Sequence, residues 1–335
     1  MRGDPLVSVL TPVYNGERHL AECIESVLAQ TYENWDYTVV DNASTDATPE
    51  IVRAYAARDP RITYLRFDDF VSATANHNRA FDAISPDSEF CKIVQADNWL
   101  YPECLARMVE AARSSATVGI VSSYRLWERR VDLAGLRYDT TFVAGRDVLR
   151  STLLGLFNLT GAPTATMLRS AFVRERRPFY EDGLRHEDTE AMLWMLSRHD
   201  LAFVHQVLTF ERLEPNSRYT WSEWMNSLGA EEIVFLLRYG RLVLNEDEYR
   251  ARLRTYLKRY VWWHVRQFPR VSRLRDPNFF EFQRSRQKLI LAESRNDAEV
   301  RAAMAFVATL LLRGAFYSPS LRKASRAMVD TRRKT

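Results

Sequence analysis

The chain has 335 residues, 46% of them hydrophobic and 27% charged, which is typical of a globular protein with one large or two modest domains. Its net charge of +4 comes from 47 basic and 43 acidic residues, which argues against a dedicated nucleic-acid-binding protein. Three cysteines without metal-like spacing predict reduced thiols, and no stretch has the length and apolar character of a membrane-spanning helix. We therefore expect a soluble, cytoplasmic protein.

Strand and helix patterns alternate through the first part of the chain, which predicts βαβ units and a mainly parallel α/β sheet flanked by helices. The expected strands are residues 6–11, 37–40, 62–67, 90–95, 118–122, 165–168 and 203–210. The expected helices are residues 17–30, 48–58, 72–84, 102–114 and 188–198. Between residues 125 and 160 the pattern weakens, and only short elements are expected there.

Beyond Pro215 the sequence changes to long helical patterns with almost no strand signal. The expected helices are residues 223–239, 246–268, 279–294 and 298–312. We therefore place a boundary near Asn216, between a domain of residues 1–215 and a helical C-terminal extension of residues 216–335.

Two predicted strands finish in polar, turn-forming residues. The first reads Val7-Ser-Val-Leu-Thr-Pro-Val-Tyr-Asn-Gly16, and the second reads Val39-Val-Asp-Asn-Ala-Ser-Thr-Asp46. Because open α/β sheets bind ligands outside the carboxyl ends of their strands, we expect a ligand site at this edge. The glycine-rich loops that usually cradle phosphate groups are absent from the sequence, so a nucleotide would be held in another way.

A third strand ends in Asp97 and Asn98, within Lys92-Ile-Val-Gln-Ala-Asp-Asn-Trp-Leu-Tyr-Pro102. A carboxylate and an amide at a strand end suit a hard divalent cation, which accepts a few protein oxygens and leaves positions for phosphate and water. The alternative is that Asp97 only caps the turn before the helix that begins near Pro102.

A fourth polar cluster, Arg185-His-Glu-Asp-Thr-Glu190, directly precedes an amphipathic helix. Acidic residues in a first helical turn are favoured by the helix dipole, and Asp188 could serve as an N-cap. The alternative is a catalytic carboxylate, ionised at neutral pH, that accepts a proton from a hydroxyl nucleophile.

Taken together, these clusters resemble the family 2 glycosyltransferases, which adopt the GT-A fold. The resemblance covers roughly residues 6–215, with the motifs in the family's order, and also includes Ile24-Glu-Ser-Val-Leu-Ala-Gln-Thr31 in the first helix. It implies an inverting, metal-assisted hexosyltransferase. Its expected partners are a nucleoside-diphosphate sugar, most commonly of UDP, and a hydroxyl of a glycan or lipid-linked acceptor, as in polysaccharide biosynthesis for the cell envelope.

The resemblance also assigns roles to residues. It implies Asp188 as the general base with Glu187 beside it, and Asp97 with Asn98 as the site of a Mg²⁺ or Mn²⁺ cofactor. The residues implied to contact the nucleotide are Thr11, Pro12, Tyr14, Asn15, Asp41, Asn78, Arg79, Gln95 and Ala96, with Asp41 accepting a hydrogen bond from the base.

The chain departs from the family pattern in the metal motif and near the end of the resemblance. Gln95 stands at the first Asp of Asp-x-Asp, Asn98 replaces a further acid, and Ala80 replaces a usual Gly. Glu214 stands where relatives often carry His, and it is either an additional oxygen ligand or a surface charge. Asp68-Asp69 is interpreted as a solvated loop.

Several alternatives remain open on the sequence. Trp99 either stacks on a sugar or belongs to the core, and residues 158–164 form either an acceptor-side loop or a simple connection. The whole protein could instead be a non-catalytic scaffold with a GT-A fold, or a nucleotidyltransferase. The helical extension could form a homodimer, and the basic segment 321–335 could contact the inner face of the membrane, although a solvated tail is the commoner explanation.

Overall fold

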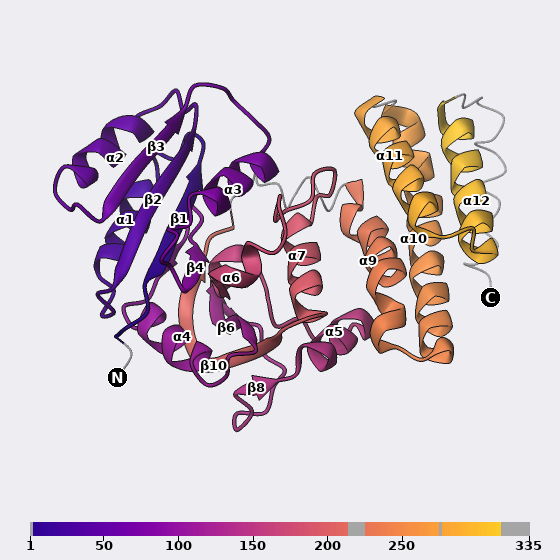
Figure 1. Ribbon diagram of the computed structural model, residues 1–335. Helices are drawn as coiled ribbons and strands as arrows, with labels where there is room; N and C mark the ends of the chain where they lie inside the picture. The colour runs from indigo at the N-terminus through magenta and orange to yellow at the C-terminus, as the bar shows by residue number, and fades with distance from the viewer. Residues whose placement is uncertain (1–2, 214–224, 275–276, 316–335) are drawn as a thin grey trace. The chain divides into compact units, whose positions relative to one another are not determined.

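The computed structural model describes residues 3–213, 225–274 and 277–315 (Figure 1). The chain forms two compact units, Met1–Ser217 and Arg218–Thr335. The predicted boundary near Asn216 and the predicted site residue Glu214 lie outside the described residues.

A ten-stranded mixed sheet forms the centre of the described part of the first unit, in the order β3-β2-β1-β4-β9-β6-β10-β5, with β7 paired to β6 and β8 to β10. The strands are β1 (Val7–Val13), β2 (Trp35–Asn42), β3 (Ile62–Phe67), β4 (Phe90–Ile93), β5 (Trp99–Leu100), β6 (Val118–Trp127), β7 (Arg130–Asp132), β8 (Phe142–Val143), β9 (Thr166–Arg169) and β10 (Asp200–Glu211).

Strands β3, β2, β1 and β4 are parallel, so the polar turns that follow them lie at one edge of the sheet. The register places Val13 beside Asp41 and Asp41 beside Arg66. Strand β9 runs antiparallel to both β4 and β6, and joins this parallel half to the parallel pair β6 and β10. The sheet is therefore parallel where the first two sequence motifs lie.

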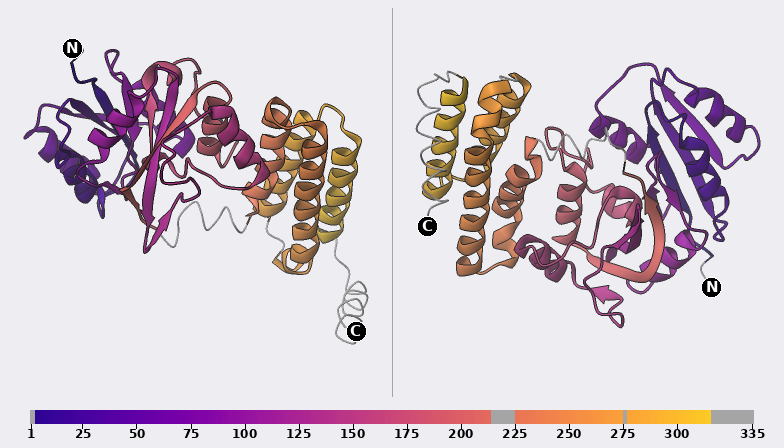
Figure 2. Two further views of the ribbon diagram at one scale, coloured as in Figure 1. Left: turned by 90° about the horizontal axis from the view of Figure 1, so that it is seen from below. Right: turned by 180° about the vertical axis from the view of Figure 1, so that it is seen from behind.

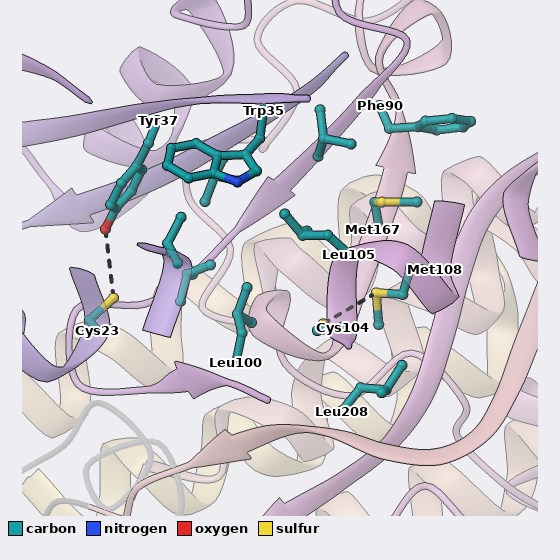
Figure 3. Packing of buried hydrophobic residues seen from close by; sticks show 14 of the residues in the cluster. Cys23, Trp35, Tyr37, Phe90, Leu100, Cys104, Leu105, Met108, Met167 and Leu208 are labelled. Carbon is teal, nitrogen blue, oxygen red and sulfur yellow. Dashed lines mark hydrogen bonds between the residues drawn. The ribbon is translucent and has the colours of Figure 1, made fainter. Parts of the chain in front are cut away.

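Helices cover both faces of this sheet. Their bounds are α1 (Leu20–Leu28), α2 (Thr48–Ala56), α3 (Ala73–Asp82), α4 (Cys104–Ala112), α5 (Gly145–Leu154), α6 (Ser170–Val173) and α7 (Glu187–Leu196). Helices α1, α2 and α4 share one buried apolar cluster with alternate residues of β1 and β2 (Figure 3). Helix α3 contacts β1 and β2, and α7 contacts β6. This alternation follows from the period of two in a strand, which sends successive side chains to opposite faces.

The expected α/β fold is confirmed, and the predicted strands and helices of the first part occur close to their expected positions. The sequence did not locate β5, β7, β8 or α5. Strands of two or three residues are too short to show an alternating pattern, because the recognisable signal needs at least four residues. Helix α5 falls in the stretch of residues 125–160, where only short elements were expected.

The described part of the second unit is helical, as expected. It contains α9 (Ser227–Val243), α10 (Glu246–Leu274), α11 (Pro277–Glu293) and α12 (Ala298–Ala315). Helix α10 contacts α9 and α12, and α11 also contacts both (Figure 2). A buried ion pair of 2.6 Å joins Arg286 to Glu231 inside this unit. In the described ranges, no helix is both long enough and apolar enough to cross a membrane.

The buried cluster beneath α4 predicts a clear difference between two substitutions on that helix. Leu105 is completely buried, whereas nearly half of the Arg107 side chain is exposed. Leu105→Ala is expected to lower the free energy of unfolding by about 2–5 kcal/mol, because it removes buried methyl groups and leaves a cavity. Arg107→Ala is expected to change it by about 0.5 kcal/mol or less. Denaturant unfolding followed by tryptophan fluorescence would measure both, and equal effects would contradict the packing described here.

Candidate active site

The turn after β1 and the loop after β2 are joined by hydrogen bonds. The Asn15 backbone N–H donates to Ser44 Oγ at 2.9 Å, and Asn15 Oδ1 accepts from the Thr45 N–H at 2.9 Å. The Gly16 N–H donates to Thr48 Oγ1 at 2.8 Å. Asn15 has a left-handed backbone (φ 51°), which asparagine tolerates better than most residues. Asn15 therefore holds two loops together, and its predicted contact with a nucleotide stays a prediction.

Gly16 is required at this turn for a steric reason. A Cβ added there would approach Val13 Cγ2 to 2.6 Å, well inside contact distance. The close approach lets the chain leave β1 and enter α1 within a few residues, at the sheet edge where the ligand site is expected.

Thr11 and Pro12 lie below the surface of this edge, and their predicted contacts with the nucleotide stay predictions. Both are buried, and the hydroxyl of Thr11 donates to the Val94 carbonyl at 2.8 Å and lies 2.8 Å from the Tyr37 hydroxyl. Thr11 therefore joins β1 to its neighbours from inside. The physical reason is that helices cover both faces of the sheet, so every residue of β1 is buried, and Thr11 lies beside Tyr37 and Cys23 of the core (Figure 3).

Tyr14 is the exposed residue of the first motif, with 49% of its surface accessible. Its ring lies 4.7 Å from the ring of Phe70, which belongs to the loop after β3 and is 63% exposed. The two aromatic rings therefore come from different loops of the same sheet edge.

Asp41 is completely buried, and both of its carboxylate oxygens have partners within the protein. Oδ1 accepts the Ser44 N–H at 2.9 Å, and Oδ2 accepts the Tyr64 hydroxyl at 2.6 Å. Arg66 forms an ion pair with Oδ2 at 3.0 Å, and its Nη2 donates to the Ser44 carbonyl. No part of the Asp41 side chain reaches the surface in this structure, and its predicted hydrogen bond to a base stays a prediction.

Asn78 and Arg79 hold neighbouring segments to α3. The Asn78 amide donates to the Tyr180 carbonyl at 2.9 Å and accepts the Tyr180 N–H at 2.8 Å. Arg79 forms an ion pair with Asp69 at 2.6 Å and lies over the ring of Phe67. Asp69 is exposed, as expected for a loop residue, but it is paired rather than only solvated. Contacts of Asn78 and Arg79 with a diphosphate remain predictions.

Asn98 organises the predicted metal motif from inside. It is buried, and its amide group donates to Gln95 Oε1 at 3.2 Å and to Thr164 Oγ1 at 3.1 Å. Its Oδ1 accepts the backbone N–H of Arg212 at 3.0 Å. A primary amide has two N–H donors, so both are used here and one oxygen lone pair is also occupied. Asn98 therefore fixes the loop, and only one lone pair remains for a metal ion.

A buried lysine supports this same loop. Lys92 Nζ donates to the carbonyls of Thr164 at 2.7 Å and Thr166 at 3.1 Å, and among the residues that the structure describes it has no carboxylate as a hydrogen-bond partner. Thr164 Oγ1 also accepts the backbone N–H of Gln95. Burial lowers the pKa of Lys92, because removing the ammonium from water disfavours its charged form.

Trp99 packs face to face on Phe210, with ring centroids 3.6 Å apart and an angle of 9° between the planes. Arg212 lies over the Trp99 ring, and its Nε donates to the Asp97 carbonyl at 3.2 Å. One face of the Trp99 ring is therefore used in packing between β5 and β10, and stacking of this residue on a sugar stays a prediction.

The acidic pair at the start of α7 divides into a buried and an accessible carboxylate. Glu187 is buried and accepts the Thr74 hydroxyl of α3 at 2.9 Å. Asp188 is half-buried, and its Oδ1 accepts the Thr189 N–H at 2.7 Å. Glu187 thus anchors α7 to α3, while Asp188 is the carboxylate that a substrate could reach.

Glu211, at the end of β10, is influenced by charged residues from several parts of the chain. It forms an ion pair with Arg125, which also pairs with Asp132 at 2.7 Å. Burial raises the pKa of Glu211; Arg125 partly offsets this, and the negative charges of Asp97 and Asp188 raise it further. The charges of Asp97 and Asp188 therefore both influence the pKa of Glu211, although 91 positions separate the two residues in sequence.

Sequence reasoning missed Glu211, Arg125 and Arg212. Glu211 and Arg212 could have been found, because they are charged residues that directly follow Phe210 at the end of a predicted strand. Polar residues at the ends of predicted strands also identified the other motifs. Arg125 carried no such signal, because it lies within β6.

The Asp97 loop offers few oxygen ligands to a divalent cation such as Mg²⁺. Among the residues that the structure describes, no group of three or more His, Cys, Asp or Glu side chains is arranged to hold a metal. Mg²⁺ often uses one or two carboxylates together with substrate phosphates and water. Asp97 supplies one carboxylate in the turn after β4, and a divalent cation at this position stays a prediction.

Comparisons with known proteins agree with this architecture. The *S. aureus* protein TarS, residues 1–349 in complex with UDP-GlcNAc, superposes with a TM-score of 0.65 at 14% identity, covering 92% of this chain and 89% of that one. The mannosyltransferase PcManGT from *Pyrobaculum calidifontis*, in complex with GDP-Man and Mn²⁺, superposes with a TM-score of 0.55 at 15% identity, covering 93% of this chain and 87% of that one. The fold is that of the GT-A glycosyltransferases.

The family assignment rests on comparisons of the sequence. Residues 8–176 match the family described as "Glycosyl transferase family 2". Glycosyltransferase GlyA of *Streptococcus pneumoniae* is 31% identical over 124 residues, which are 36% of this chain and 17% of that protein. The putative glycosyltransferase EpsH of *Bacillus subtilis* is 32% identical over 108 residues, covering 32% of this chain and 30% of that protein. The chain belongs to glycosyl transferase family 2, a family of transferase enzymes.

The environment of Glu211 predicts a pH dependence of stability. A carboxyl group whose pKa is raised by folding contributes most stability below its unfolded value of about 4.3, and this contribution is lost as the pH rises through the folded pKa. The stability of the wild type relative to Glu211→Gln is therefore expected to fall as the pH rises through that window. Denaturant unfolding at a series of pH values would measure it, and a constant difference across the window would contradict the raised pKa.

Proposed function

We propose that this protein is an inverting glycosyltransferase that moves a sugar from a nucleoside diphosphate to a hydroxyl of a glycan or a lipid-linked acceptor. The observation that carries the proposal is the match of residues 8–176 to glycosyl transferase family 2, in a chain that carries Asp97 in the turn after β4 and a half-buried Asp188 in the first turn of α7. An inverting displacement needs a base on one side of the sugar and stabilisation of the leaving group on the other. These two carboxylates supply one candidate for each role.

Asp188 is the proposed general base. Its place in the first turn of α7 favours the ionised carboxylate, because the helix dipole is positive there. Asp188 would accept the proton of the acceptor hydroxyl while the hydroxyl oxygen attacks the anomeric carbon. The nucleoside diphosphate would leave from the opposite side. Glu187, through its bond to Thr74, would keep this turn of α7 in position.

Asp97 is the proposed carboxylate for Mg²⁺ or Mn²⁺ at the donor diphosphate. The ion would neutralise charge on the departing diphosphate, which is the Lewis-acid role of a bound metal. Arg212 and Asn98 would hold the Asp97 loop in place, through the hydrogen bonds that join β10 to this loop. UDP is the first nucleotide to test, since TarS was solved with UDP-GlcNAc, and GDP is the second, since PcManGT was solved with GDP-Man.

A non-catalytic binding subunit is the second candidate. The observation that favours it is the hydrogen bonding of Asn98, which leaves the metal motif with Asp97 as its single carboxylate. The half-buried position of Asp188 in the first turn of α7 favours the enzyme, because a scaffold has no need for a partly accessible carboxylate there. The helical unit is proposed to serve association, with a second copy or with an acceptor-bearing membrane surface.

Replacing the proposed base should separate catalysis from donor binding. Asp188→Asn is expected to lower turnover by roughly 10²–10⁴, the usual contribution of a positioned general base, while nucleotide binding is retained. Release of UDP from UDP-sugars with a suitable acceptor, together with calorimetry of UDP binding, would measure the two effects. Asp182→Asn, an exposed acid in the preceding loop, is the control and should keep wild-type turnover. Wild-type turnover in Asp188→Asn would remove this residue from its role.

Replacing the proposed metal ligand should remove the dependence on the cation. A nucleoside diphosphate at about 100 times its dissociation constant adds about 2.7 kcal/mol to the stability of the native state. Thermal unfolding of the wild type with UDP is therefore expected to show a larger stabilisation when Mn²⁺ is present. Asp97→Asn should lose this difference, whereas Asp68→Asn, an exposed loop acid, should keep it. An unchanged Mn²⁺ effect in Asp97→Asn would make Asp97 a turn residue.

A further inference from the structure

We infer that one face of the helical unit, formed by α10 and α12, docks on a lipid surface that carries negative charge. This α10–α12 face comprises the exposed residues Lys258, Trp262, Arg266, Phe306 and Leu312. Its occupant is a bilayer with anionic headgroups, rather than a second copy of the chain. The inference goes beyond glycosyl transfer and does not depend on it, because lipid binding requires neither a sugar donor nor a sugar acceptor.

Helices α10 and α12 lie side by side and run in the same direction (Figure 1). Arg250 forms an ion pair with Asp297, which directly precedes α12, and Arg254 forms an ion pair with Glu299 at 2.9 Å. The second pair lies further along both helices than the first. The two helices are therefore parallel neighbours.

The exposed side chains of the two helices lie on the same side of this pair. With about 3.6 residues per turn, Trp262 lies about 80° around α10 from Arg254, in one sense of rotation. Phe306 and Leu312 lie about 20° and about 140° around α12 from Glu299, in the opposite sense. Because parallel helices face each other across their contact, opposite senses of rotation lead to the same side. Trp262 and Phe306 also lie at nearly the same height, about 12 Å and about 10 Å beyond the Arg254 ion pair.

Helix α12 lacks the polar outer side of a helix that faces only water. Residues 302–312 contain no charged side chain, although Phe306 is 49% exposed and Leu312 is 53% exposed. A surface helix normally carries polar residues opposite its buried stripe, and a helix that is apolar all round is usually covered. Trp262 adds an aromatic ring that is 57% exposed. These eleven residues of α12 extend about 16 Å, which suits a helix lying in the plane of a bilayer surface.

Positive charge near this face selects the occupant. Lys258 and Arg266 are exposed about one helical turn before and after Trp262. Residues 321–335, which lie outside the described residues, contain six basic residues and one acidic residue and follow α12 in the sequence. Anionic headgroups attract such basic segments, and an apolar face together with a basic segment gives the two signals that stable membrane binding needs. A second copy of the chain would bring the same positive charge and is not complementary.

Binding of the full-length chain to lipid vesicles tests the partner. The chain is expected to float with vesicles of equal parts phosphatidylcholine and phosphatidylglycerol on a sucrose gradient. Its affinity for vesicles of phosphatidylcholine alone should be lower by about tenfold or more, because the attraction to anionic headgroups is lost. Added salt should also weaken binding to the mixed vesicles, because it screens exposed charges.

A double variant on α12 tests the face itself. Phe306→Gln with Leu312→Gln removes apolar area that would enter the bilayer, and it is expected to weaken binding to the mixed vesicles by about tenfold or more. Both side chains are about half exposed, so the variant should keep its helical content in circular dichroism. The matched control is Leu228→Gln with Leu242→Gln, two exposed leucines of α9, which should bind as the wild type does.

Selective loss of vesicle binding in the α12 variant, with unchanged helical content, supports the inference. If the wild type does not bind the mixed vesicles, or if the α12 variant binds them as well as the control does, the inference is wrong. A dimer that sedimentation detects in the wild type and that only the α12 variant loses, without vesicle binding, would assign this face to a second copy instead. None of these measurements contains a nucleotide sugar, so the proposed function stands or falls separately.

Discussion

The candidate site depends on the hydrogen bonds that the buried ammonium group of Lys92 donates to backbone carbonyls. An unpaired charge inside a protein is costly, and Lys92 avoids that cost by donating to two carbonyls on the segment that leads into β9. That segment also carries Thr164, whose hydroxyl accepts from Gln95 and Asn98. One buried group thus connects the parallel half of the sheet, the antiparallel strand β9 and the loop that carries Asp97.

Most polar side chains of the motifs form hydrogen bonds within the protein that hold the segments around the site together, rather than pointing into the site. Asn15, Asn78 and Asn98 each join two segments that are distant in sequence, and Glu187 joins α7 to α3. Their side chains satisfy backbone groups that loops would otherwise leave without partners. The more accessible groups at the edge are fewer: Tyr14 is exposed, and Asp97 and Asp188 are half-buried. These hydrogen bonds hold the loops together without a ligand, and a site that is already formed loses less conformational freedom on binding.

Much of the fold could be predicted from the sequence. The α/β alternation, the parallel strands, the long C-terminal helices and the polar strand ends all follow from local periodicity and turn chemistry, which depend on neighbouring residues alone. The family assignment followed from the same motifs. The short strands β5, β7 and β8 could not be predicted, because pairing with distant partners stabilises them and their own residues carry too little pattern.

The sequence by itself determined which residue types stand at each strand end, and therefore the class of chemistry at the sheet edge. Only the tertiary structure decided which of those side chains are accessible. Asp41 and Thr11 have the expected identities but lie buried with partners, while Arg66 and Arg125 pair with Asp41 and Glu211 from within β3 and β6, strands that carried no motif. The physical reason is that burial and hydrogen bonding are set by neighbours across the sheet, and strand register rather than sequence distance selects those neighbours.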